Sequence, residues 1–124
     1  MSTPSKKPGL LRTTLAQRVV VADGAMGTML QAANPTLEDF QNHEGCNEIL
    51  NVSRPDIVRS VHNEYLAAGV DAVETNTFGA NWSNLADYGI EDRIYELAFA
   101  GGKIARESAD SFSTADKPRF VLGS

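Results

Sequence analysis

Two polar segments of this sequence carry residue types suited to binding a small polar ligand. The first is DGAMGT at residues 23–28, where the carboxylate of Asp23 is followed by two glycines, Gly24 and Gly27. Glycines let backbone amides approach a ligand closely. The segment has neither the lysine of a phosphate-binding loop nor the spacing of a dinucleotide-binding loop, so a nucleotide site is disfavoured. The alternative interpretation is that the glycines serve a tight turn and Asp23 caps a helix.

The second segment is ETNTFG at residues 74–79. Because side chains alternate along a strand, Glu74 and Asn76 are expected on one face, and Thr75 and Thr77 on the other. A carboxylate and an amide near the end of a buried strand are costly unless they are partnered. They therefore predict a polar site that holds the ammonium or carboxylate of an amino acid. A buried polar network that closes the fold is the alternative.

Other reactive residue types do not form a recognisable catalytic pattern. His43 and Cys46 form an H-x-x-C pair, with His62 as a remote third candidate. Zinc sites use three or four protein ligands, so we expect no metal site from these residues. His62 falls beside apolar residues of a predicted helix and is interpreted as a boundary histidine rather than a base. The spacings indicate no Ser-His-Asp or Cys-His arrangement, and no catalytic residue is assigned.

These segments are positioned by alternating strand and helix patterns. Ser53 is expected to cap the second helix, Pro55 to begin it and Gly69 to end it. The predicted order is a strand at 19–22, a helix at 28–33, an irregular connection at 35–52, a helix at 54–68, a strand at 70–78, a helix at 91–111 and a strand at 119–122. Such alternation indicates an α/β fold with parallel strands and helical crossovers.

The number of strands separates two parallel architectures. A complete doubly wound domain of this length would have about five strands, and only three are predicted. A TIM (β/α)8 barrel takes roughly 250 residues. We therefore expect residues 18–124 to form the first part, about three strands, of a truncated barrel, preceded by a flexible leader over residues 1–17.

Composition excludes several classes of protein. The 124 residues are 42% hydrophobic, and 11 basic against 16 acidic residues give a net charge of −5. These values argue against disorder, and they provide no basic surface for nucleic acid or for an anionic membrane. No apolar run approaches the roughly 20 residues of a membrane helix or forms the core of a signal peptide. The single cysteine is compatible with a cytoplasmic location.

Four motifs, in order and spacing, resemble the homocysteine S-methyltransferase family. They are DGAMGT at 23–28, GCNEILN at 45–51, RPD at 54–56 and ETNTFGAN at 74–81. The resemblance covers residues 18–124. The GCNEILN motif favours the cobalamin-dependent branch over the betaine-dependent and S-methylmethionine-dependent enzymes.

The resemblance implies a (β/α)8 barrel that binds homocysteine and a zinc ion held by cysteine thiolates of late strands. Zinc would stabilise the homocysteine thiolate, which takes a methyl group from methylcobalamin. Another module would regenerate methylcobalamin from methyltetrahydrofolate. By position, Asp23 and Gly24 match the family's first substrate loop, and residues 74–77 match its second-strand segment. The substrate-binding residues implied are Asp23, Gly24, Glu74, Thr75, Asn76 and Thr77.

The resemblance also sets expectations for the chain by itself. The zinc ligands would lie beyond residue 124, and Cys46 corresponds to none of them. We therefore expect the isolated chain to bind neither zinc nor cobalamin tightly and to transfer no methyl group. Two alternatives stay open: a cobalamin-independent homocysteine methyltransferase, and a truncated remnant without enzymatic activity.

Overall fold

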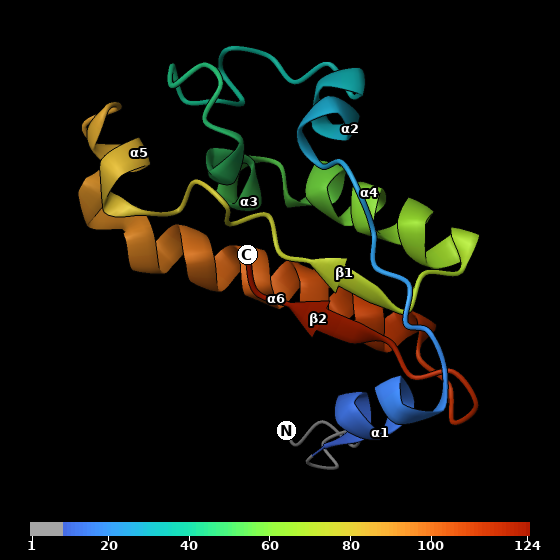
Figure 1. Cartoon of the computed structure of the whole chain (residues 1–124). Helices are drawn as coiled ribbons and strands as arrows, with labels where there is room; N and C mark the ends of the chain where they lie inside the picture. Colours follow the sequence, from blue (N-terminus) through green and yellow to red (C-terminus); the bar gives the residue numbers. More distant parts are fainter. Residues whose placement is uncertain (1–8) are drawn as a thin grey trace.

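The computed structural model describes residues 9–124, which form more helix than strand (Figure 1). The helices are α1 (Leu10–Gln17), α2 (Gly27–Ala32), α3 (Leu50–Ser53), α4 (Pro55–Ala68), α5 (Trp82–Ala86) and α6 (Ile94–Phe112). Two 3₁₀ turns, η1 (Asn47–Ile49) and η2 (Glu91–Arg93), precede α3 and α6. The strands are β1 (Ala72–Glu74) and β2 (Phe120–Leu122).

The strands run parallel, as the sequence predicts. β1 and β2 pair with Ala72 opposite Phe120 and Glu74 opposite Leu122. On the other side of β1, Ala22 forms a single parallel bridge with Ala72. The extended segment before α2, β1 and β2 thus lie side by side in that order. Both strands are shorter than predicted, because regular pairing stops where the chain turns into loops.

The structure corrects the strand predicted at residues 19–22, because this segment is neither regular nor buried. Val19 is 80% exposed and Val21 is 52% exposed. The segment is held by Asp71, whose carboxylate accepts the Val21 N–H at 2.9 Å and pairs with Arg18 at 2.9 Å. The β-branched residues favour extended backbone, but within residues 9–124 only β1 pairs with the segment, so the valine side chains stay in solvent.

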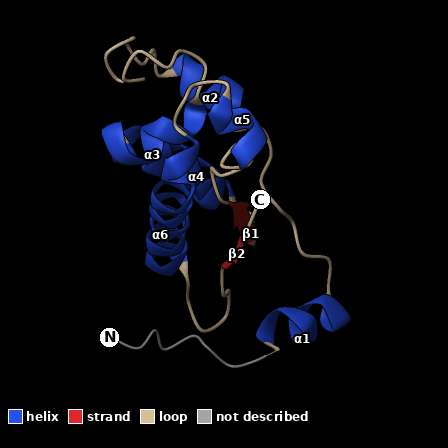
Figure 2. Ribbon diagram, turned by 90° about the vertical axis from the view of Figure 1, so that its left-hand side faces the viewer, coloured by secondary structure: helices blue, strands red, loops and turns tan. Residues whose placement is uncertain are grey.

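One face of the small sheet is covered by α4 and α6 (Figure 2). The core between them and the strands contains Leu66, Val70, Val73, Ala105 and Val121. The opposite face carries no helix in the described part of the chain. The strands run towards the end of the molecule where α2, α3 and α5 gather (Figures 1 and 2).

The two long helices agree with the sequence patterns. α4 begins at Pro55 and ends at Gly69, whose backbone is left-handed at φ 108°. The predicted cap is wrong, because Ser53 is the last residue of α3 and its hydroxyl donates backwards to the carbonyl of Ile49 in η1. Arg54 precedes Pro55 without a side-chain cap. α6 follows η2 and covers nearly the predicted residues.

The connection at 35–52 is less irregular than predicted, because η1 and α3 occupy its last residues. Ile49 and Leu50 are fully buried there. The sequence patterns do not predict α5 either; its cap is the Asn81 side chain, which accepts the Asn84 N–H at 2.8 Å. Helices of three to five residues are too short to show periodicity, so tertiary packing stabilises them.

The predicted leader at 1–17 is only partly described. Residues 1–8 lie outside the described residues, and residues 10–17 of the leader form α1. Its flexibility stays a prediction. Among residues 9–124, none of the helices has the length and apolar character needed to cross a bilayer.

Candidate functional site

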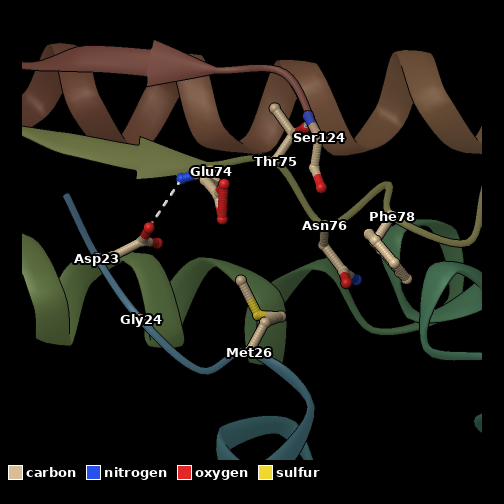
Figure 3. Close-up of a pocket in the computed structure, with 8 residues that line it drawn as sticks. All are labelled: Asp23, Gly24, Met26, Glu74, Thr75, Asn76, Phe78 and Ser124. Carbon is tan, nitrogen blue, oxygen red and sulfur yellow. Dashed lines mark hydrogen bonds between the residues drawn. The ribbon is translucent and has the colours of Figure 1, made fainter.

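A pocket of about 180 Å³ lies where the carboxyl ends of the parallel segments meet (Figure 3). It is lined by Asp23, Gly24, Met26, Glu74, Thr75, Asn76, Phe78 and Ser124. Parallel α/β folds bind ligands at this end of their strands, because the loops there converge on one place. The pocket is therefore the candidate functional site.

Asp23 joins the two predicted segments. Its Oδ1 accepts the backbone N–H of Glu74 at 3.1 Å, which ties the DGAMGT loop to the end of β1 (Figure 3). Partial burial raises the pKa of Asp23, the hydrogen bond from Glu74 opposes that rise, and the Glu74 carboxylate adds to it. Asp23 caps no helix, since α2 begins after Met26 without a side-chain cap.

The DGAMGT loop is also held from α4 by a residue that the sequence analysis missed. The Tyr65 hydroxyl donates to the Ala25 carbonyl at 2.8 Å. A Cβ on Gly24 would lie 3.5 Å from the same hydroxyl. The sequence pattern places Tyr65 only on the apolar face of its helix, and no local signal indicates its contact with a loop 40 residues away.

Glu74 faces the pocket because strand side chains alternate. Val73 is buried beneath the helices, whereas the next side chain, Glu74, is exposed on the opposite face. Among the described residues that line the pocket, two are carboxylates and none is basic. A negatively charged lining attracts an ammonium group by simple electrostatics.

Asn76 belongs both to the pocket lining and to a buried polar network. Its Nδ2 donates to the Asn47 carbonyl and to Asn51 Oδ1, each at 3.0 Å. The two interpretations of the ETNTFG segment are therefore compatible: Asn76 takes part in a buried network, while Glu74 remains open to the pocket.

Thr75 and Thr77 connect this segment to the end of β2. Their hydroxyl oxygens lie 2.7 Å apart. Thr77 donates to the Ser124 carbonyl at 3.0 Å, and the Ser124 N–H donates to Thr75 at 3.1 Å. Thr75 lines the pocket but Thr77 does not, so the structure brings five of the six predicted site residues together. Whether they bind substrate stays a prediction.

Three lining residues are absent from the predicted set: Met26, Phe78 and Ser124. Met26 and Phe78 lie within the DGAMGT and ETNTFG motifs, so a predicted site that included every residue of both motifs would have contained them. Ser124 follows β2, and the rule that parallel strands end at one edge could have indicated it.

The residues considered as metal ligands lie apart from the pocket lining. Cys46 Sγ lies 3.7 Å from a Glu48 carboxylate oxygen, and the His43 ring packs edge-on against Tyr88. His62 is fully buried, which corrects its interpretation as a boundary residue, and burial lowers its pKa to about 4. The described residues contain no group of three His, Cys, Asp or Glu side chains that could hold a metal. They do not fit the thiolate zinc centre implied by the resemblance.

Comparisons with known proteins identify relatives of the chain. Residues 20–124 match the sequence profile of homocysteine S-methyltransferases. Methionine synthases of Mycobacterium tuberculosis and Mycobacterium leprae are each 59% identical over 114 residues, which is 92% of this chain. That region is 10% of each relative, so the chain spans about a tenth of their length.

Solved structures agree in fold. The metallated form of the homocysteine methyltransferase MmuM from Escherichia coli matches with a TM-score of 0.72 and 24% identity, over 91% of this chain and 40% of that one. Its oxidized form matches with a TM-score of 0.69 over 92% of this chain and 39% of the other. The described chain thus has the fold of part of such a protein.

Proposed function

This chain belongs to the homocysteine S-methyltransferase family, and on that premise we propose that its pocket binds homocysteine in a cobalamin-dependent methionine synthase. The single observation that carries the proposal is the meeting of Asp23 and Glu74 at one pocket beyond the strand ends. The 59% identity to proteins named methionine synthase favours this branch over enzymes that use betaine or S-methylmethionine.

The chain's own residues bind and orient the substrate in this proposal. The Asp23 and Glu74 carboxylates receive the ammonium group of homocysteine, because no basic side chain is present among the described lining residues to compete for them. Gly24 keeps the backbone beside them accessible. Thr75, Thr77 and Asn76 hold the surrounding wall, as their hydrogen bonds indicate.

The remaining parts of the reaction belong to the full-length protein. We place the zinc ligands, and the modules for methylcobalamin and methyltetrahydrofolate, outside residues 1–124, since the relatives are about ten times longer. When bound, zinc would favour the thiolate form of homocysteine, and methylcobalamin would provide the methyl group. The match to part of MmuM supports completion of the parallel sheet as a (β/α)8 barrel. A cytoplasmic location, compatible with a lone cysteine, belongs to the same proposal.

The experiment compares Asp23→Asn and Asp23→Ala in the full-length protein by steady-state kinetics with homocysteine. The asparagine variant keeps an acceptor for the Glu74 N–H but removes the charge. We expect either change to raise the homocysteine KM about tenfold to a hundredfold, since a charged hydrogen bond contributes about 1.5–3 kcal/mol. Asp116→Asn, at an exposed turn, is the matched control. An unchanged KM and kcat for Asp23→Ala would remove Asp23 from the substrate site.

A further inference from the structure

One wall of the pocket continues beyond the end of the strand pairing. Thr75, Asn76 and Phe78 line the pocket, yet β1 ends at Glu74. The last backbone hydrogen bond to β2 on this side joins the Thr75 N–H to the Leu122 carbonyl. The position of the rest of this wall, residues 76–79, therefore depends on contacts from elsewhere in the molecule.

Glu48 supplies the first of these contacts. This buried side chain belongs to the GCNEILN segment, residues 45–51, and its Oε2 accepts the Gly79 N–H at 3.0 Å. A Cβ on Gly79 would lie 2.9 Å from both Glu48 carboxylate oxygens, so the close approach requires glycine. At the same residue, Asn84 Nδ2 donates to the Gly79 carbonyl at 2.8 Å.

The Glu48 carboxylate has no basic partner within 4 Å in the described part of the chain. A buried carboxylate without a cation is costly, and a backbone N–H is one of the groups that offsets that cost. The loop therefore gains a charged acceptor at one defined point.

Asn51 supplies the second contact and holds Asn76 at two points. Its Nδ2 donates to the Asn76 carbonyl at 2.8 Å, and its Oδ1 accepts from Asn76 Nδ2 at 3.0 Å. The same Nδ2 also donates to the Leu97 carbonyl of α6 at 3.1 Å. The loop is thereby connected to the helix layer through one buried amide.

We propose that Glu48 and Asn51 are positioning residues for homocysteine binding: neither lines the pocket, and both hold the wall formed by residues 76–79. The inference rests on the proposed function of the pocket. It gives the GCNEILN segment a role in binding affinity, exerted through Gly79 and Asn76 rather than by contact with substrate.

The test compares Glu48→Ala with Glu48→Gln in the full-length protein, using homocysteine KM, kcat and the thermal unfolding midpoint. The glutamine variant retains a side-chain oxygen for the Gly79 N–H, whereas the alanine variant does not. We expect Glu48→Ala to raise KM about tenfold with a smaller change in kcat, since a hydrogen bond to a charged group contributes more than a neutral one and the alanine variant loses it entirely. Glu48→Gln should restore KM to within about threefold of the wild-type value, because its side-chain oxygen still accepts a neutral hydrogen bond from the Gly79 N–H.

Glu44→Ala is the matched control, because Glu44 is an exposed carboxylate four residues earlier. Asn51→Asp is a second test that does not depend on the folding of Glu48→Ala. It keeps the acceptor for Asn76 Nδ2 but loses the bonds that Asn51 donates to the Asn76 and Leu97 carbonyls. We expect this variant also to raise the homocysteine KM. A lower unfolding midpoint with unchanged KM in the folded variants would overturn the inference.

The Asp23 variants separate this inference from the function on which it depends. If Asp23→Ala raises KM while the Glu48 and Asn51 variants leave it unchanged, the pocket binds homocysteine and the positioning role is wrong. If Asp23→Ala leaves KM and kcat unchanged, Asp23 is not part of the substrate site, and the failure lies in the proposed function rather than in the positioning role.

Discussion

Two adjacent glycines of α6 have very different surroundings. A Cβ on Gly101 would lie 2.7 Å from Thr77 Cγ2 and 2.8 Å from Asn51 Nδ2, whereas a Cβ on Gly102 would meet nothing within 4 Å. We expect Gly101→Ala to destabilise the fold by about 1–3 kcal/mol through overpacking. Gly102→Ala should stabilise it by about 0.5–1 kcal/mol by reducing the entropy lost on helix formation. Urea unfolding of both variants checks this, and equal effects would contradict it.

His62 predicts a specific pH dependence of stability. It is fully buried, neither ring nitrogen has a hydrogen-bond partner among the described residues, and burial lowers its pKa to about 4. In the unfolded chain the histidine has a pKa near 6.5. Below that pH the unfolded chain therefore binds a proton at His62, whereas the folded chain keeps His62 neutral down to about pH 4. Stability conferred by neutral His62 is therefore complete above about pH 6.5 and falls as the pH drops towards 4.

Replacement with an apolar residue tests this dependence. Between pH 6.5 and 4, the free energy of unfolding should fall less in His62→Leu than in the wild type. The difference should reach up to about 3 kcal/mol, at about 1.4 kcal/mol per pKa unit. The measurement is the free energy of unfolding of both proteins across that pH range. A constant difference between them would show that His62 does not titrate in this way.

Sequence reasoning at the residue scale works where a general rule places side chains. Asp23 and Glu74 could be placed together because parallel strands end at a common edge. Glu48, Asn51 and Tyr65 could not, because each acts on a loop at least 25 residues away in the chain. Their contacts depend on tertiary packing, which periodicity does not encode.

At the element scale, length decides what the sequence reveals. α4 and α6 present enough turns for an apolar stripe to be visible, and the sequence predicts both nearly to their ends. η1, α3 and α5 are too short for that signal. At residues 19–22 the sequence instead predicts a strand that the structure does not form. The β-branched residues indicate extended backbone, but they do not indicate whether a neighbouring element covers it.

The end of α4 gives a prediction at this scale. Gly69 has φ 108°, a conformation that L side chains rarely adopt, and its N–H caps the helix by donating to the Leu66 carbonyl at 3.0 Å. Gly69→Ala should lower the free energy of unfolding by about 1 kcal/mol or more, because the left-handed conformation strains any Cβ. Gly69→Asn should cost less, since asparagine visits that region more readily. Equal unfolding midpoints for the wild type and Gly69→Ala would contradict the prediction.

At the scale of the whole molecule, the sheet is covered on one side only within the described residues. α4 and α6 pack on one face (Figures 1 and 2). Val19 and Val21, on the outer segment, are exposed. The homocysteine methyltransferase MmuM is about two and a half times as long as the region matched here, which covers 40% of it. Within the described residues, the edge of the sheet formed by residues 19–22 is therefore open.

An open sheet edge with exposed valines makes the isolated 124-residue polypeptide prone to self-association, because unpaired backbone groups there accept another strand. We expect its weight-average mass to rise with concentration in sedimentation equilibrium. Val21→Lys should reduce that rise, since a charged side chain on an edge opposes pairing. Leu15→Lys is the matched control: Leu15 is 56% exposed on α1, which stands apart from the sheet (Figure 2). If both changes reduce association equally, general surface hydrophobicity is responsible and the edge is not.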